Sequence, residues 1–379
     1  MKPAKFARAP VFNGERMVAR DRKTQSLNAA SHGARSRHWQ MEAAHSIMKP
    51  RSGFTVIELL ISLAIISLLL GLTLPAVQRV REVSRSAACS SRLRQLGVAC
   101  QSFETTHRHF PDYGGPDGYI RWSHAVLLDH LGYAALSSQL PWDLSDQGGI
   151  DISQDGPPVV PWPSDVWKTP ISDFVCPSDT TPLGGNNFRA SYGTIVSDTH
   201  TWKPGMGPRP ADVFNESLNG ILRAAASPAQ VTDGLSNTVL YSERIVGDGD
   251  HSRYTPSRDI AGFQTAYFHW PNDAIIFCSG TTPPTTIISY SGWTWAIGGG
   301  ANHSYNHVAT PNSRIPDCLA GPGNPIGIGV FSARSWHPGG VNVVFADGAT
   351  RFIADHIDLR VWRGLGTMYG AEVLSDSDF

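Results

Sequence analysis

The feature that most constrains this chain is an uninterrupted apolar segment near its N-terminus. Residues 54–74 read FTVIELLISLAIISLLLGLTL and contain one charged residue, Glu58. About 20 apolar residues are enough for a helix to cross a bilayer. The apolar part of a secretory signal is shorter, roughly 7–15 residues, and ends at a small-residue cleavage site that is missing after Leu74. A buried helix of a soluble domain is the other alternative. Residues 59–74 are sixteen consecutive residues without charge, and this length disfavours a buried helix, so a membrane span is predicted.

Charge is distributed unevenly on the two sides of this segment. The net charge is −1, but residues 1–53 contain eleven Lys and Arg against three Asp and Glu. The rest of the chain therefore contains twenty basic and twenty-nine acidic residues. Basic residues before a span indicate an N-terminus on the cytoplasmic side. The acidic remainder lacks the positive surface that nucleic-acid binding requires, so we expect no nucleic-acid partner.

Residues at the start of the span resemble the N-terminal signature of type IV prepilins and pseudopilins. The sequence from Gly53 reads GFTVIELL, with Glu58 as the fifth residue after the glycine. The resemblance implies cleavage between Gly53 and Phe54 by a prepilin peptidase, and N-methylation of Phe54. It also implies that Glu58 pairs with the terminal amine of a neighbouring subunit, which would make a carboxylate in the membrane tolerable; the alternative is a carboxylate that reaches water at the membrane face. Pro75 lies where such pilins often have a helix-kinking proline.

The chain is predicted to have four parts. Residues 1–53 are a leader. Met48-Lys-Pro-Arg-Ser-Gly would be a complete leader by itself, so we expect translation to start at Met48 or Met41. Residues 1–47 are then expected to lie outside the protein. Residues 54–74 are the transmembrane part of a long helix. Residues 75–107 continue that helix with apolar residues at three- and four-residue steps, and should dock on a globular domain. The apolar stripe includes Val77, Val80, Leu93, Leu96, Cys100 and Phe103. The opposite face fits a solvated surface and contains Arg79, Arg81, Arg85, Arg92 and Arg94.

Residues 108–379 are predicted to form a β-rich extracytoplasmic domain, which makes the fold class α+β. The clearest element is a hairpin in which Asp347-Gly348 connects strands at 341–345 and 349–353. We also expect a short helix within 355–365, and strands at 173–176, 220–223, 237–245 and 273–278.

Motifs in this domain resemble the bacterial domain-of-unknown-function 1559 family. They read FVCPSD at 174–179, SYG at 191–193, DGLSNT at 233–238 followed by Glu243, and HPGGVN at 337–342 followed by Asp347-Gly348. The family combines a prepilin-type N-terminus with an element of His, nine residues and Asp-Gly, and His337 and Asp347 keep that spacing. Trp336 departs from the family, which more often has Arg there, and this leaves the role of His337 open. The family has no established activity, so the resemblance implies an architecture and a processing route.

Two groups of residues have the chemistry of a ligand site. His337 and Asp347 could be catalytic or bind a metal, but no third ligand lies at metal spacing, so we favour a loop cap for His337 and turn chemistry for Asp347. Asp233, Ser236 and Asn237 could hold Ca²⁺, but they lack the regular acidic spacing of a calcium loop, so a turn is favoured. We expect no cofactor.

Histidine and tryptophan patterns give weaker indications. His303 and His307 are four residues apart but follow three glycines, which favours a surface loop over a zinc site. Trp293 and Trp295 point to one face if extended and could stack on sugars, although most tryptophans should serve packing.

The five cysteines permit two disulfides in an extracytoplasmic domain. Cys89 and Cys100 are separated by about 16 Å along one helix, so they cannot bridge each other. Cys278–Cys318 is the first expected pair, and Cys176 with either Cys89 or Cys100 is the second.

These observations predict a non-enzymatic, pilin-like protein with a single inner-membrane pass. Its expected partners are the prepilin peptidase and N-methyltransferase, other pilin-like subunits and the lipid bilayer, in a type IV pilus or a type II secretion-like filament. One alternative is a membrane-anchored binding module, such as one for surface glycans. A hydrolase around His337 and Asp347 is the third reading, and the sequence contains no nucleophile motif for it.

Overall fold

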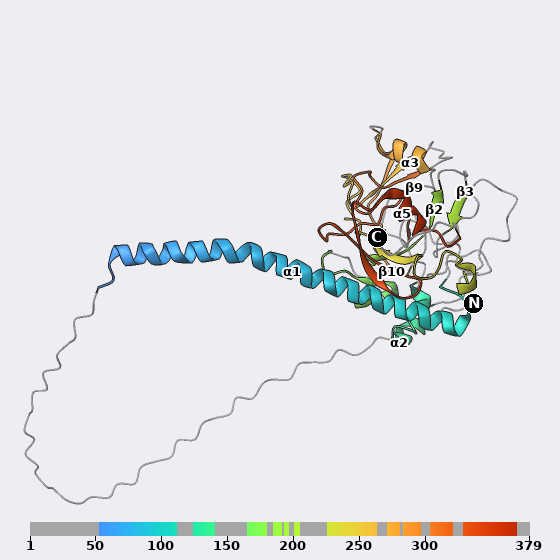
Figure 1. Ribbon diagram of the computed structural model, residues 1–379, viewed down its shortest axis with the longest axis horizontal. Helices are drawn as coiled ribbons and strands as arrows, with labels where there is room; N and C mark the ends of the chain where they lie inside the picture. Colours follow the sequence, from blue (N-terminus) through green and yellow to red (C-terminus); the bar gives the residue numbers. More distant parts are fainter. Residues whose placement is uncertain are drawn as a thin grey trace, which may run out of the picture. The chain divides into compact units, whose positions relative to one another are not determined.

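The computed structural model confirms the α+β class, with a long N-terminal helix and a β-rich C-terminal region (Figure 1). The chain divides into two compact units, residues 1–62 and 63–379. The structure describes residues 53–111, 124–140, 165–179, 185–191, 193–196, 201–204, 226–263, 271–280, 283–296, 304–320 and 329–369.

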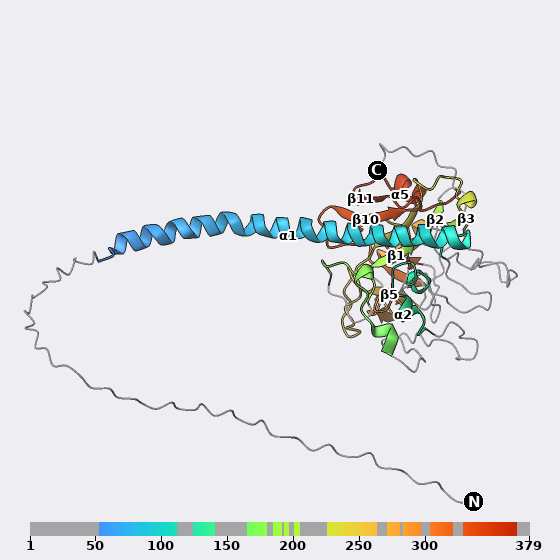
Figure 2. The ribbon, with the colours of Figure 1, turned by 90° about the horizontal axis from the view of Figure 1, so that it is seen from below.

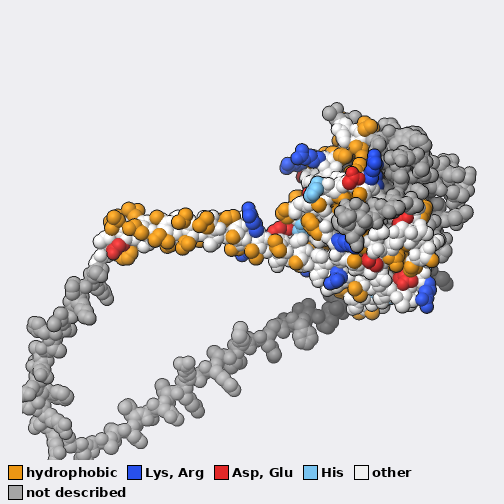
Figure 3. Space-filling model, in the orientation of Figure 1, with side chains coloured by type: hydrophobic (Ala, Val, Ile, Leu, Met, Phe, Trp, Pro, Cys, Tyr) orange, Lys and Arg blue, Asp and Glu red, His pale blue; other side chains and the backbone are white. Residues whose placement is uncertain are grey.

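Helix α1 spans Val56–His107 and confirms the predicted long helix. It continues through Pro75 without interruption, which a proline allows when neighbouring groups compensate for its missing N–H. The apolar side chains from Val56 to Leu74 are exposed to the solvent, and Figure 3 shows them as a hydrophobic surface along this part of the helix. In length and composition, this segment meets the requirements of a membrane span.

A five-stranded sheet forms the centre of the domain. β10 pairs with β11 and β4, and β4 pairs with β1, all antiparallel, whereas β1 and β7 are parallel. The order across the sheet is β11 (Thr350–Ala354), β10 (Gly340–Phe345), β4 (Val239–Glu243), β1 (Phe188–Ser191) and β7 (Ser304–Tyr305).

Two smaller sheets and several short helices complete the described fold. In the four-stranded sheet β5 and β8 are parallel, and its order is β6 (Thr286–Ile288), β5 (Ile260–Phe263), β8 (Cys318–Ala320) and β9 (Gly329–Val330). A two-stranded sheet contains β2 (Gly193–Val196) and β3 (Thr201–Pro204). The helices are α2 (Ala134–Ser137), α3 (Pro271–Cys278) and α5 (Leu359–Gly364), with 3₁₀ turns at Ala125–Leu127, Asp165–Lys168, Ser172–Phe174 and Pro228–Gln230.

The five-stranded sheet has a hydrophobic core on each face. Successive side chains of a strand point to opposite faces, and β10 follows this rule. Val341, Val343 and Phe345 belong to a core that includes Trp362 of α5, whereas Val344 belongs to the core that includes α1. α1 and α5 therefore cover opposite faces of the sheet, and Figure 2 shows the second half of α1 beside β1 and β10.

Helix α1 packs closely against the sheet at Gly97. A Cβ atom at this position would lie 2.6 Å from Cγ2 of Val344, so a larger residue would push the helix away. Val77 and Val80, which were expected in the apolar stripe, remain exposed, so docking begins later along the helix than predicted. The buried residues of α1 are Cys89, Leu93, Leu96, Gly97, Ala99, Cys100 and Phe103.

The structure confirms the predicted hairpin, the strand within 237–245 and the terminal helix, but two strand predictions are wrong. Residues 172–174 form a 3₁₀ turn, and the N–H of Cys176 bonds to the side chain of Asn187 instead of to a strand. Residues 271–278 form a helix, because Pro271 suits the first turn of a helix and a short apolar run does not distinguish the two structures. The strand predicted at 220–223 lies outside the described residues.

Two histidines are buried without charge in the core. Nε2 of His124 lies 2.6 Å from the carbonyl of Phe188. His307 was expected in a surface loop, but it is buried: Nδ1 lies 2.7 Å from the carbonyl of Trp362, and Nε2 lies 2.9 Å from the hydroxyl of Tyr305. The sequence did not indicate the burial of His307, because the glycines before His307 predict a turn and do not show which residues cover it. His303 lies outside the described residues.

These histidines should make the fold sensitive to acid. Burial lowers the pKa of His124 and of His307 to about 3, against 6.5 for an ordinary histidine. Below pH 6.5 the unfolded chain therefore binds protons that the folded chain does not, and the free energy of unfolding falls as the pH falls. The expected loss is about 1.4 kcal/mol per pH unit for each histidine between these pKa values. Urea unfolding in detergent should show a shallower pH dependence for His307→Gln than for the wild type.

The matched control is His356→Gln, which changes an exposed histidine. Its pH dependence should equal that of the wild type. An unchanged slope in His307→Gln would show that His307 does not stay neutral in the folded protein.

Candidate functional site

The segment that resembles a prepilin cleavage site is exposed and lies before the helix. Gly53 and Phe54 are exposed and precede the first residue of α1, so the peptide bond between them lies outside the helix. Thr55 and Glu58 form a capping box: the Glu58 carboxylate accepts from Thr55 N at 2.9 Å, and Thr55 Oγ1 accepts from Glu58 N at 3.3 Å. Glu58 therefore closes the first turn of its own helix, a role that the sequence analysis did not consider.

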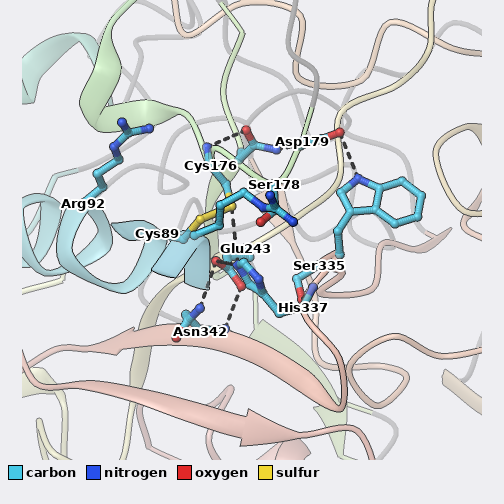
Figure 4. The surroundings of a disulfide bond; sticks show 12 residues. Cys89, Arg92, Cys176, Ser178, Asp179, Glu243, Ser335, His337 and Asn342 are labelled. Carbon is cyan, nitrogen blue, oxygen red and sulfur yellow. Dashed lines mark hydrogen bonds and ion pairs between the residues drawn. A yellow bond between two sulfur atoms is a disulfide. The ribbon is translucent and has the colours of Figure 1, made fainter. Parts of the chain in front are cut away.

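A second site lies where α1 meets the sheet, around the buried side chain of His337 (Figure 4). Nδ1 of His337 lies 2.7 Å from Oε1 of Glu82 on α1. Nε2 lies 3.2 Å from Oε1 of Glu243 at the end of β4. His337 therefore connects a carboxylate of the helix to a carboxylate of the sheet.

Glu243 is held from the neighbouring strand. Its Oε2 accepts a hydrogen bond from the backbone N–H of Asn342 at 2.8 Å, and its Oε1 accepts from the Asn342 side chain at 3.1 Å. Asn342 lies in β10, which pairs with β4 in antiparallel register. The neighbouring strand therefore holds the Glu243 carboxylate independently of its contact with His337.

The two carboxylates favour the protonated imidazole. Burial alone would lower the pKa of His337, but the hydrogen bonds and charges of Glu243 and Glu82 outweigh burial and raise that pKa above its ordinary value. Burial would raise the pKa of Glu82, and the bonds to His337, Arg85 and Ser178 outweigh it and lower that pKa. The charges of the cluster are thus mutually compensated, as buried charges must be.

A disulfide bond between Cys89 and Cys176 adjoins this cluster. Cys89 belongs to α1 and Cys176 follows the 3₁₀ turn, so the bond links the helix to the domain covalently. The second disulfide joins Cys278 of α3 to Cys318 of β8. Cys100 is free and buried, and burial raises the pKa of its thiol, so it stays protonated and unreactive.

Asp179 organises the outer side of the cluster. Its Oδ2 accepts from Asn187 and from the backbone of Val246, both at 2.9 Å. Its Oδ1 accepts from Nη2 of Arg258 at 3.1 Å and from Nε1 of Trp336 at 2.9 Å. Trp336, the residue at which the chain departs from the family pattern, therefore supplies an N–H donor where arginine is more common.

Glu82 and its contacts are the part of the site that the sequence analysis missed. Glu82 and Cys89 are seven residues apart and so lie on the same face of α1. That spacing is the one signal that could have indicated Glu82, since its basic neighbours suggested a solvated face.

The other predicted residues lie apart from this cluster. His337 and Asp347 are at opposite ends of β10, so the structure does not bring them together. The Asp347 carboxylate accepts from the N–H of Ala349 at 2.8 Å, and Gly348 has a positive φ of 85°, as the hairpin turn requires.

Residues 233–238 form a turn stabilised by their own side chains. Asn237 donates to the carbonyl of Asp233 at 3.1 Å, Thr238 donates to the carbonyl of Gly234 at 3.1 Å, and the Asp233 carboxylate accepts from Thr367 at 2.9 Å. These bonds give the Asp233 carbonyl and one of its carboxylate oxygens partners inside the protein. Trp295 is fully buried, and Trp293 donates to the carbonyl of Gly247, so both tryptophans serve packing.

Comparisons with known proteins show the family to which the chain belongs. Residues 78–360 match the family described as "Protein of unknown function (DUF1559)", and residues 48–74 match the "Prokaryotic N-terminal methylation motif". The chain is 33% identical over 73 residues to the competence protein ComGC of Halalkalibacterium halodurans, which covers 18% of this chain and 72% of that protein. No solved structure matches the chain. The family match covers most of the chain and contains every residue of the His337 cluster, so the chain belongs to the DUF1559 family and carries a prokaryotic N-terminal methylation motif.

Proposed function

We propose that the chain is a pilin-like subunit that is cleaved after Gly53, methylated at Phe54 and anchored in the membrane by residues 54–74. The observation that carries this proposal is the methylation motif at 48–74, which ends within an exposed apolar helix. Similarity to ComGC supports a structural, pilin-like role over catalysis. In an assembled filament, the apolar faces of neighbouring helices would cover the side chains that are exposed in the single chain.

The globular domain is proposed to lie outside the cytoplasm. Two disulfide bonds support this location, since disulfides persist in oxidising compartments. Lys49 and Arg51, which precede the span directly, support a cytoplasmic leader. Prepilin peptidase, the N-methyltransferase and other pilin-like subunits are the proposed partners.

The His337 cluster is proposed to fix this domain on α1. A filament subunit must transmit force between its membrane helix and its outer domain. The cluster supports that role because a disulfide joins α1 to the loop at Cys176, and the contacts of His337 join α1 to Glu243 of β4.

Replacement of Gly53 by alanine should block maturation. The Gly53→Ala precursor should accumulate uncleaved, because Gly53 supplies the carbonyl of the scissile bond and its replacement introduces a Cβ there. The measurement is mass spectrometry of the membrane-bound protein, in which the wild type should begin at N-methylated Phe54. Normal cleavage of Gly53→Ala would contradict the processing proposal.

Glu58→Gln is the matched variant for assembly. Glutamine retains the acceptor of the capping box but removes the charge. This variant should be cleaved and methylated normally yet fail to enter filaments or sheared surface fractions. Normal assembly of Glu58→Gln would show that the charge of Glu58 has no role in pairing subunits.

Truncation of Glu243 should destabilise the domain. Glu243→Ala leaves His337 without its sheet partner and leaves two donors of Asn342 unpaired in the interior, with an expected cost of about 3–5 kcal/mol. Urea unfolding in detergent measures this change in free energy. Asp129→Ala, at an exposed carboxylate, is the control and should change stability by less than about 0.5 kcal/mol. A cost below about 1 kcal/mol for Glu243→Ala would contradict the role of the cluster in stability.

A further inference from the structure

The His337 cluster contains the ligand set of a transition-metal site. One ligand atom each from Cys89, Cys176, Glu243 and His337 lies within 4.8 Å of all the others, and all four residues are buried. Two sulfurs, one imidazole nitrogen and one carboxylate oxygen are donors that Zn²⁺ accepts in its four-coordinate sites. Among the residues that the structure describes, this is the group of such donors that converges on one point.

Two of the distances within the cluster fit a tetrahedral ion, and the two sulfurs, which are bonded to each other, would have to separate. Nε2 of His337 lies 3.5 Å from Sγ of Cys176 and 3.2 Å from Oε1 of Glu243. An ion with bonds of about 2.0–2.3 Å to nitrogen, oxygen and sulfur separates such ligand pairs by roughly 3.3–3.6 Å. The nitrogen and oxygen positions therefore need little movement to receive the metal.

The residues behind the ligands are placed as in a metal site. Zinc-bound histidines commonly donate their other ring N–H to a carboxylate, and Nδ1 of His337 lies 2.7 Å from Glu82. Nε2 is then the atom that faces the cluster. Asn342 holds the Glu243 carboxylate in the same way, through two hydrogen bonds from β10.

We propose that the protein binds one Zn²⁺ at Cys89, Cys176, Glu243 and His337 when the Cys89–Cys176 disulfide is reduced. A dithiol protein would supply two electrons and two protons, becoming a disulfide while the two cysteines become thiols. Binding of Zn²⁺ then releases the two thiol protons, and any proton on Nε2, and forms bonds to two thiolates, the imidazole and the carboxylate. The Cα atoms of the two cysteines are 5.0 Å apart, so rotation of the side chains can separate the sulfurs while the backbone stays in place.

The site lies beside a small pocket and between elements that an ion could join. The pocket, about the size of one water molecule, is lined by Cys176, Glu243, Ser335 and Trp336 and so adjoins two of the ligands. The ion would connect the same elements as the disulfide, namely α1 with the loop after the 3₁₀ turn and, in addition, β4 and the residues before β10. The helix would then remain fastened to the domain in a reducing environment, where the disulfide is lost.

Cobalt binding tests the proposal, because Co²⁺ occupies zinc sites and reports thiolate ligands by its absorption. The full chain carries Cys278→Ser and Cys318→Ser, which remove the thiols of the other disulfide. This protein is purified in detergent. After reduction with a phosphine in oxygen-free, metal-free buffer, it should bind one equivalent of Co²⁺ with tetrahedral d–d and thiolate charge-transfer bands. One equivalent of Zn²⁺ should displace the cobalt and raise the melting temperature of the reduced protein but not of the oxidised protein.

Variants distinguish this site from adventitious binding. His337→Ala and Cys89→Ser should abolish the thiolate–cobalt spectrum, and Glu82→Gln, which retains all four ligands, should weaken binding about 10- to 100-fold. Asp129→Ala should bind as the parent does. Failure of the reduced parent to bind Co²⁺, or an unchanged spectrum in His337→Ala, would overturn the proposal; neither result bears on cleavage at Gly53, which is measured separately.

Discussion

The structure depends on the contact between the imidazole of His337 and two carboxylates that come from different parts of the chain. Glu82, which is part-buried, belongs to the helix, and Glu243, which is buried, belongs to the sheet; the Glu243 carboxylate would be unstable in the interior without a compensating partner. His337 contacts both carboxylates through its two ring nitrogens, and Arg85 also pairs with Glu82. The Cys89–Cys176 disulfide beside it makes the same connection covalent.

This arrangement explains how one helix serves two environments. Among the described residues, the apolar side chains of α1 up to Leu74 have no packing partner, whereas one face of the helix from Cys89 onward is buried against the sheet. The His337 cluster lies where the second environment begins, at Glu82 and Cys89. Beyond it, Gly97 allows close packing against Val344, so the helix is fastened by polar contacts first and by apolar contacts further along.

The elements that the sequence predicted are those determined by local pattern. The long helix follows from a charge-free stretch and a three- to four-residue period, and the β10–β11 hairpin follows from alternation around Asp347-Gly348. The predictions for 173–176 and 273–278 were wrong because short apolar runs fit either a strand or a helix. His307 was placed at the surface because its neighbours are turn residues, while its burial depends on Trp362, far along the chain.

The His337 cluster could not be predicted for the same physical reason. Its members come from α1, the loop at Cys176, β4 and the residues before β10, and nothing local at any of these positions specifies the others. The sequence motifs identified Cys176, Glu243, His337 and Asn342 separately as family features. The tertiary fold is what makes them one site.

The most direct test of the account is the disulfide connectivity of the natural, unreduced protein. Free thiols are alkylated under denaturing conditions, the protein is digested without reduction, and linked peptides are identified by mass spectrometry. The account predicts a peptide containing Cys89 joined to one containing Cys176, with Cys100 alkylated. A link between Cys100 and Cys176 would contradict it, because the helix would then have to present a different face to the His337 cluster.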